Sequence, residues 1–172
     1  MKKAREKGVV LIAAAGNAGP KSPPLFPAAD PNVIAVTATD ANDKVFAKAN
    51  RGPQVALAAP GVEILEPAPN GGYQLTTGTS VAAAHVSGVA ALLIERNPTA
   101  DPAAIQEILT MSAKNLAPGG RNDEVGWGLV DPTRALGELD AKVARDRDFV
   151  PGKPLPAMPK PPAARPRPVM TR

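Results

Sequence analysis

A continuous apolar run ends at a turn in the stretch Val9-Val10-Leu11-Ile12-Ala13-Ala14-Ala15-Gly16-Asn17. Aliphatic and β-branched residues followed by Gly-Asn are typical of a strand buried on both faces of a parallel sheet. Residues 33–38 form a second run of this kind and residues 55–58 a shorter third one. The aliphatic stretch between Thr79 and Asn97 predicts a helix that is apolar nearly all round and therefore buried.

Two Asp-Pro pairs mark the starts of further helices, at Asp101-Pro102 and Asp131-Pro132. Each pair offers an N-cap acceptor followed by proline in the first turn. Ile105, Ile108 and Leu109 then fall on the inner face of the first of these helices. Strands that alternate with helices predict an α/β fold, with a mainly parallel sheet flanked by helices.

The composition excludes several classes of protein. No run approaches the roughly 18 apolar residues of a membrane span, so we expect no membrane-spanning segment. The 172 residues include no cysteine and one histidine, which excludes disulfides, thiolate metal sites and a histidine-rich metal centre. The net charge of +4 lies entirely in residues 138–172, and the neutral remainder argues against nucleic-acid binding.

The last 22 residues, 151–172, contain eight prolines, five basic residues and no acidic residue. Proline removes backbone donors and fixes φ, so we expect this segment to be a disordered basic tail. We therefore divide the chain into a domain over residues 1–137, a helical extension or linker over 138–150, and the tail. The tail is either a solvated end or a docking site for a proline-recognising domain or an anionic surface.

Two local patterns carry candidate chemistry. The glycine turn in Gly78-Thr79-Ser80 delivers a serine to the start of a helix, where the dipole and free N–H groups favour negative charge. Ser80 is thus a candidate nucleophile, although serine and threonine are also ordinary N-cap residues. Asn17 follows a strand at its carboxyl end, where ligand groups collect in parallel sheets. Its side-chain amide either donates to an oxyanion or serves a turn.

Together these two patterns resemble the subtilisin-like serine proteases (subtilases, peptidase family S8). Three further segments match the family in the same order, so that the resemblance covers about residues 1–137. They are residues 26–38, which contain Phe26-Pro27-Ala28, then Ala59-Pro60-Gly61, and residues 126–136, which begin Gly126-Trp127-Gly128.

The resemblance implies a role for each matching residue. Ser80 corresponds to the nucleophile, and Asn17 to the side-chain donor of the oxyanion hole. The substrate-binding positions of the family correspond to Ala14, Ala15 and Gly16, as one wall of the specificity pocket, and to Gly78 and Thr79. The resemblance also predicts a cis peptide bond between Phe26 and Pro27.

The chain departs from the family in its acid–base residues. In subtilases the order is Asp, His, Ser, but the 79 residues before Ser80 contain no histidine. Asp30, Asp40 and Asp43 lie between the later motifs and do not match the catalytic aspartate. His85 comes five residues after Ser80 on the same helix, about 140° round and roughly 7 Å along its axis. A base must lie within hydrogen-bond reach, so we interpret His85 as structural.

We interpret the chain as the C-terminal part of a subtilase catalytic domain, a serine endopeptidase that acts on protein or peptide substrates through Ser80. The missing N-terminal part of the same domain is then a partner, and we expect the chain alone, without the catalytic Asp and His motifs, to be inactive. The alternatives are a non-catalytic pseudoprotease remnant and an interaction module built on the tail. The chemistry requires no cofactor; the family often binds structural calcium, for which no acidic cluster here specifies a site. The resemblance implies a secreted or cell-envelope location.

Overall fold

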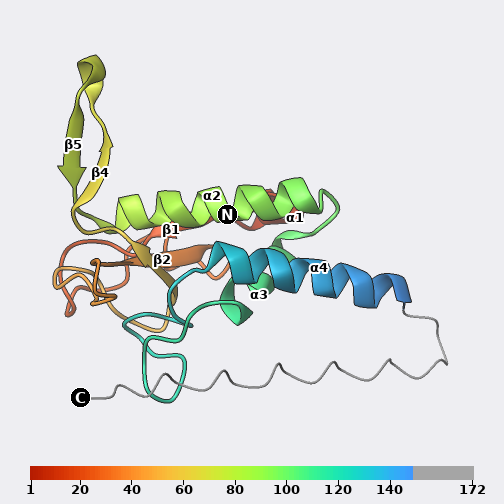
Figure 1. Ribbon diagram of the computed structural model, residues 1–172. Coiled ribbons are helices and arrows are strands. Elements are labelled where there is room, and N and C mark those ends of the chain that lie inside the picture. The colour runs from red at the N-terminus through yellow and green to blue at the C-terminus, as the bar shows by residue number, and fades with distance from the viewer. Residues whose placement is uncertain (149–172) are drawn as a thin grey trace, which may run out of the picture.

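The computed structural model describes residues 1–148, so the predicted tail over 151–172 lies outside the described residues. A parallel sheet forms the centre of the domain, with the order β1 (Ile12–Ala14), β2 (Ile34–Thr39) and β3 (Val55–Pro60) (Figure 1). Ile12 pairs with Ile34, and Val36 pairs with Leu57. The predicted α/β architecture with a parallel sheet flanked by helices is confirmed.

The outer edge of β3 is covered by the segment at residues 127–130. Trp127 N–H donates to the Ala56 carbonyl at 2.9 Å, and Ala58 N–H donates to the Gly128 carbonyl at 2.8 Å. Leu129 in turn pairs with Lys114 on the far side of this segment. Thus β3 has partners on both edges, whereas β1 has only β2 as a partner among residues 1–148.

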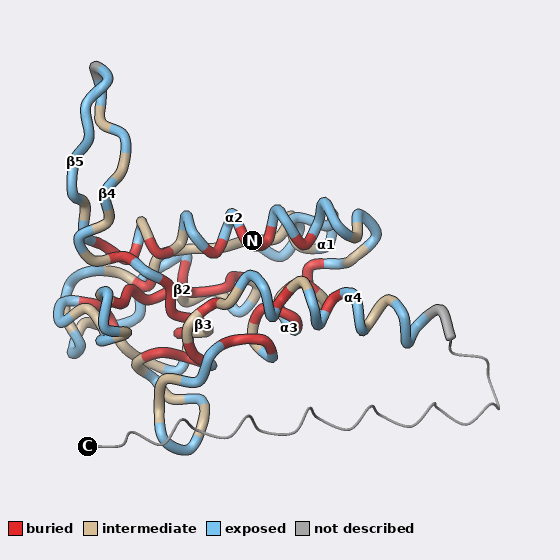
Figure 2. Tube along the Cα trace, in the orientation of Figure 1, coloured by how far each residue is buried: buried red, intermediate tan, exposed pale blue. Residues whose placement is uncertain are grey.

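The prediction that the first strand is buried on both faces is wrong. All three residues of β1 are half-buried, while every residue of β2 is buried (Figure 2). The physical reason is the position of β1 at the free edge of the sheet, where no neighbouring strand of the described residues shields it.

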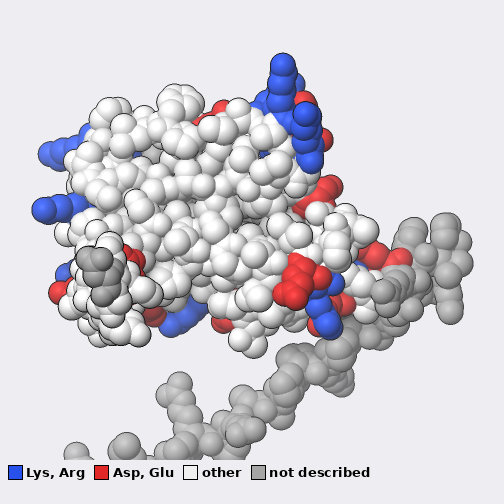
Figure 3. Space-filling view, turned by 90° about the horizontal axis from the view of Figure 1, so that it is seen from above, with Lys and Arg blue, Asp and Glu red and all other residues white. Residues whose placement is uncertain are grey.

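The central helix α2 (Thr79–Arg96) lies along the sheet and buries one face against it (Figure 1). Its inner face is formed by Ala82, Val86, Val89, Ala90 and Leu93. The prediction of a helix buried all round is wrong for its outer face, where Leu92 and Ile94 are 45% and 39% exposed. No described segment covers this apolar outer face, and charged side chains lie mainly at its margins (Figure 3).

Helices α3 (Pro102–Met111) and α4 (Pro132–Asp148) begin where the two Asp-Pro pairs predict. Asp101 Oδ1 accepts a hydrogen bond from Ala104 N–H at 2.7 Å, and Asp131 Oδ1 accepts one from Arg134 N–H at 3.0 Å. The predicted inner face of α3 is buried. Because α4 runs on to Asp148, the segment predicted as a helical extension or linker starts as a continuation of this helix. A short helix, α1 (Lys2–Glu6), precedes β1.

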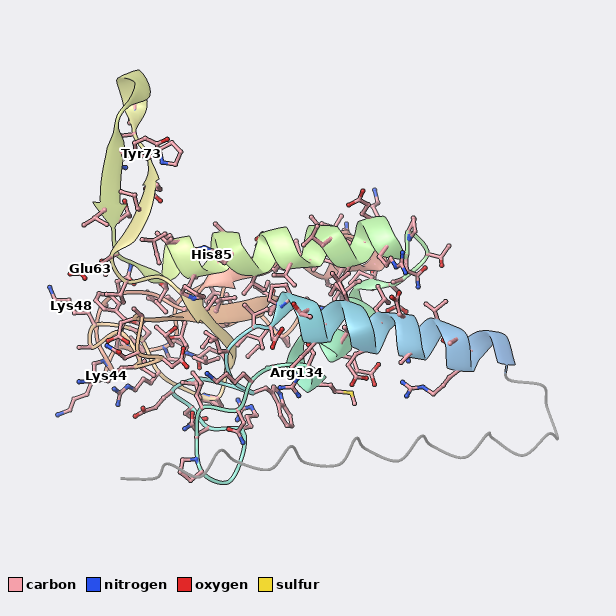
Figure 4. The ribbon with its side chains drawn as sticks, viewed as in Figure 1. Lys44, Lys48, Glu63, Tyr73, His85 and Arg134 are labelled. Carbon is pink, nitrogen blue, oxygen red and sulfur yellow. The ribbon has the colours of Figure 1, made fainter. Side chains whose placement is uncertain are left out.

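A β-hairpin projects from the body beside the start of α2 (Figure 1). It consists of β4 (Ile64–Pro67), a 3₁₀ turn at Pro69–Gly71 and β5 (Tyr73–Thr76), which pairs antiparallel with β4. Tyr73 lies on this projecting arm and is exposed (Figure 4). The Thr76 hydroxyl and then the Gln74 amide donate to the Glu66 carboxylate, and these hydrogen bonds lower the pKa of Glu66. No helix of the described residues is long and apolar enough to cross a membrane.

Candidate active site

Asn17 lies in the loop that follows β1, and its side chain is anchored to the first residue of α2. Asn17 Oδ1 accepts hydrogen bonds from Thr79 N–H and from the Thr79 hydroxyl, both at 3.0 Å. Because a backbone N–H can only donate, the atom that faces it is the amide oxygen. The Asn17 Nδ2 group therefore points elsewhere. It donates to no protein acceptor among the described residues, and the Asn17 side chain is exposed.

Thr79 joins the loop to the helix. It is fully buried, and its hydroxyl also accepts a hydrogen bond from Gly16 N–H at 3.1 Å. One hydroxyl thus donates to Asn17 and accepts from Gly16, two residues that lie more than 60 positions earlier in the chain. A buried polar group with both partners in place is well satisfied, so these contacts fix the geometry of Gly16 and Asn17 relative to α2.

Ser80 is the second residue of α2, and its side chain is exposed. The Ser80 N–H group belongs to the first turn of the helix, where backbone donors lack an intrahelical acceptor. It donates to no acceptor within residues 1–148. Positive helix-dipole potential and a free N–H group therefore coincide beside the serine hydroxyl.

Gly78 leaves space between the two free donors. A Cβ atom added at Gly78 would lie 3.3 Å from Asn17 Nδ2 and 3.8 Å from Ser80 N. Two nitrogen donors thus lie within 4 Å of one point that holds no side chain. Donors arranged around an open point in this way can stabilise an oxygen that gains negative charge.

The residues predicted to line a specificity pocket differ in their exposure. Ala14 and Gly16 are half-buried, whereas the side chain of Ala15 is buried completely. A residue without exposed surface offers neither its side chain nor its backbone to a substrate, so the accessible positions among the three are Ala14 and Gly16. The predicted cis peptide bond between Phe26 and Pro27 is confirmed.

His85 is exposed on α2, and its Nδ1 lies 3.1 Å from the Val81 carbonyl of the same helix (Figure 4). The three aspartates between the motifs serve other contacts. Asp30 accepts from the Asn32 backbone and side chain, which lowers the pKa of its carboxyl group, and Asp40 accepts from the N–H groups of two turn residues. Asp43 pairs with Lys114 at 2.7 Å. None of these carboxylates bonds to His85 or Ser80 within the described part of the chain.

The structure also brings Asn50 to this site, a residue to which the sequence analysis assigns no role. Asn50 is fully buried and contacts the loop that carries Asn17. In the sequence it stands beside Arg51-Gly52, where asparagine is ordinarily a turn residue, so no local pattern indicates its partner 30 residues earlier. Within residues 1–148, no three His, Asp or Glu side chains are placed so that together they could hold a metal ion.

An α/β domain with two free donors beside a helix-terminal serine is an arrangement typical of hydrolases that act through a serine and an oxyanion hole. Comparison with known proteins agrees with this class. A family model described as the subtilase family matches residues 1–128. The chain belongs to the subtilase family.

Three relatives illustrate the similarity. The minor extracellular protease Epr of Bacillus subtilis (strain 168) is 35% identical over 128 residues, which cover 74% of this chain and 20% of the relative. Alkaline elastase YaB of Bacillus sp. (strain YaB) is 38% identical over 77% of this chain and 34% of its own. Subtilisin DY of Bacillus licheniformis is 35% identical over 75% of this chain and 47% of its own. The chain thus spans between about a fifth and about half of the length of these relatives.

Proposed function

We propose that these residues supply the nucleophile and the oxyanion hole of a serine endopeptidase, with Ser80 as the nucleophile and Asn17 as the side-chain donor. The observation that carries the proposal is the double anchoring of Asn17 Oδ1 by Thr79, at 3.0 Å from both its N–H and its hydroxyl. This anchoring directs the free Nδ2 group toward the space beside Gly78 and Ser80.

In the proposed reaction the Ser80 hydroxyl attacks the carbonyl carbon of a peptide bond, and the carbonyl oxygen becomes an oxyanion. The Asn17 Nδ2 and Ser80 N–H groups donate to that oxygen, which lowers the barrier because both donors are already in place. The general base takes the proton of the Ser80 hydroxyl and gives it to the amine that leaves when the tetrahedral intermediate collapses. An acyl group remains on Ser80, and water then removes it as the free acid. Ala14 and Gly16 border the space for the residue that precedes the cleaved bond.

The reaction needs a general base, and we place it outside these 172 residues. His85, the one histidine of the sequence, lies five positions after Ser80 on a continuous helix. Its Nδ1 lies 3.1 Å from the Val81 carbonyl of the same helix. We propose that a histidine and its orienting aspartate come from residues encoded upstream of Met1 or on a separate chain. The term assembled protease denotes these 172 residues together with that part.

Two surfaces support such an assembly. The edge of β1 has no strand partner among residues 1–148, and the outer face of α2 carries few charged side chains (Figure 3) and exposes Leu92 and Ile94. Free peptide groups on a strand edge and an uncovered apolar face both favour burial against further protein. By analogy with the extracellular protease that this chain resembles, we propose that the assembled protease acts outside the cell.

The proposal is tested by hydrolysis of casein and of a peptide p-nitroanilide with an apolar residue before the cleaved bond. We expect the assembled protease to cleave both, Ser80→Ala to abolish cleavage, and Ser87→Ala, on the same helix, to leave it unchanged. For Asn17→Ala, the loss known for subtilisin itself, about 10²–10³ in kcat, sets the expected scale. An assembly that binds these peptides but does not cleave them would instead indicate a non-catalytic remnant.

A further inference from the structure

Asn50 lies in the loop between β2 and β3 and is fully buried behind the loop that carries Asn17. Its backbone N–H donates to the Gly16 carbonyl at 2.9 Å. Its Oδ1 accepts a hydrogen bond from Ala18 N–H at 2.8 Å. One residue therefore holds the peptide groups on both sides of Asn17 without touching the Asn17 side chain.

The side-chain amide nitrogen of Asn50 also has a hydrogen-bond partner. Its Nδ2 donates to the Ser22 hydroxyl at 3.3 Å, further along the same loop. Gly16 packs so closely against this amide that a Cβ atom there would lie 2.6 Å from Asn50 Nδ2. A buried asparagine whose backbone N–H, Oδ1 and Nδ2 are all hydrogen-bonded is costly to misplace, because a shift leaves these groups unpaired.

The Asn17 loop is thus held from two directions. On one side, Thr79 of α2 bonds to Gly16 N–H and to Asn17 Oδ1. On the other side, Asn50 bonds to the Gly16 carbonyl and to Ala18 N–H. Thr79 sets where the amide oxygen lies, and Asn50 sets the backbone from which that side chain extends.

We propose that Asn50 is a positioning residue of the oxyanion hole: by fixing the backbone on both sides of Asn17, it keeps the Asn17 amide beside Ser80. The inference rests on the proposed function and goes further by naming what holds the donor in place. Its physical basis is preorganisation, since a donor stabilises the oxyanion fully only when it needs no rearrangement during the reaction.

The first test compares Asn50 variants of the assembled protease. Asn50→Leu keeps the volume but removes the side-chain hydrogen bonds, and a displaced donor should lower kcat between about 10- and 100-fold with KM nearly unchanged. Asn50→Asp keeps an acceptor for Ala18 N–H and can accept from the Ser22 hydroxyl, so it should restore most of kcat. If Asn50→Leu does not fold, Asn50→Ser, whose hydroxyl is too short to reach Ala18 N–H, replaces it.

Asn97→Leu is the matched control. Asn97 Oδ1 accepts from Thr99 N–H at 3.3 Å and from the Thr99 hydroxyl at 2.8 Å, at the opposite end of α2 from Ser80. This variant also loses two loop hydrogen bonds, so its stability should fall while its kcat stays unchanged. A kcat loss in Asn97→Leu equal to that of Asn50→Leu would show a general effect of loosened loops and overturn the inference.

A double variant tests whether Asn50 acts through Asn17. In an Asn17→Ala background the donor is absent, so adding Asn50→Leu should lower kcat by less than about twofold. Independent, multiplicative losses would overturn the inference, as would an unchanged kcat in Asn50→Leu alone.

A measurement without catalysis separates this inference from the proposed function. Hydrogen–deuterium exchange of residues 16–22 should accelerate in Asn50→Leu and stay slow in Asn97→Leu. Unchanged exchange in Asn50→Leu would show that Asn50 does not hold the loop. If exchange of residues 16–22 is slow in the wild-type assembly but that assembly hydrolyses no peptide, the proposed function fails. The structural part of the inference, that Asn50 holds this loop, then survives.

Discussion

Gly16 is the residue at which the strand gives way to the loop of the site, and the absence of a side chain there is a packing requirement. Its φ is +112°, and a Cβ atom would lie 2.6 Å from Asn50 Nδ2 and 2.9 Å from Leu25 Cδ1. Gly19, three positions later, has a similar φ of +102° but nothing within 4 Å of its Cβ position. The two glycines therefore share backbone strain and differ in the space around them.

This pair gives a prediction in which both alanine variants carry similar backbone strain. Gly16→Ala and Gly19→Ala both place alanine at positive φ, but only the first also forces apart Asn50 and Leu25. We expect Gly16→Ala to lower the free energy of unfolding by about 1–3 kcal/mol more than Gly19→Ala, the usual cost of overpacking. Denaturation of the assembled protease by urea, followed by circular dichroism, measures the difference. Equal losses in the two variants would contradict the close packing of Gly16.

Thr79 provides a second residue-scale prediction. Thr79→Val preserves shape but removes the hydroxyl that bonds Gly16 N–H and Asn17 Oδ1. The half-buried Gly16 N–H donor is then left unpaired, at a cost of up to about 1–3 kcal/mol. Thr77→Val is the control, since the Thr77 hydroxyl accepts only from Glu63 N–H, at an exposed position. We expect the control to lose less stability and no kcat. A similar kcat in Thr79→Val and wild type would show that this hydroxyl does not position Asn17.

The residues of the candidate site could largely be named from the sequence, since Ser80, Asn17 and Thr79 lie in local patterns. What could not be predicted is how they are joined. Asn50 reads locally as a turn residue, and its contacts with Gly16 and Ala18 exist only because β2 brings two distant loops together. A side chain whose role depends on a partner about 30 residues away leaves no signal in its own neighbourhood.

At the scale of elements, an ion pair joins helices α2 and α4. Arg96 Nε lies 2.8 Å from Asp140 Oδ1, and Arg96 Nη2 donates to Asp140 Oδ2 at 3.1 Å. The hydrogen bonds from Arg96, and then its charge, hold the pKa of Asp140 below its ordinary value. An aspartate with a lowered folded-state pKa stabilises the fold above its unfolded-state pKa, near 4, and loses this contribution as the pH falls through the folded-state pKa.

The resulting prediction concerns acid stability. Asp140→Asn removes the titrating carboxylate, so the variant should lose less of its thermal stability than the wild type when the pH is lowered from about 5 to about 3. Asp146→Asn, further along α4, is the control, because Asp146 forms no ion pair among the described residues. We expect the effect to be small and to weaken in salt, since both partners are exposed. Identical pH profiles for wild type and Asp140→Asn would contradict a folded-state role for the pair.

Elements that are specified by a short stretch of sequence could be predicted, and the other elements could not. The two Asp-Pro helix starts and the buried strands β2 and β3 were predictable, because capping and apolar runs are local properties. The hairpin of β4 and β5 was not, since Pro67 and Pro69 interrupt its pattern and its side chains are mostly exposed. The outer face of α2 was misjudged because composition reports that a face is apolar but not whether a neighbour covers it.

At the scale of the whole molecule, the β3 edge of the sheet is paired with residues 127–130, whereas the β1 edge has no strand partner among residues 1–148. Leu11 O and Ala15 N–H bond to β2, and since alternate residues of a parallel strand bond to the same side, Ala13 bonds to β2 as well. The peptide groups of Ile12 and Ala14 then point to the free edge. An edge with unpaired donors and acceptors recruits a further strand, from the rest of the assembled protease or, without it, from a second copy.

This asymmetry predicts that these 172 residues self-associate when produced alone. Ala14→Pro removes a donor from the free edge and should reduce association, measured by light scattering, while circular dichroism stays unchanged. Ala13→Pro, the control, removes a donor that bonds to β2 and should disrupt the fold. A monomeric, cooperatively unfolding wild-type chain would contradict the prediction.

Whether Ser80 is an activated nucleophile is tested by reaction of the assembled protease with a fluorophosphonate probe, followed by mass spectrometry of its peptides. We expect one modified residue, Ser80, with labelling abolished by Ser80→Ala, retained by Ser87→Ala and slowed by Asn17→Ala. Labelling of a different serine, or of none in a folded assembly, would contradict this expectation.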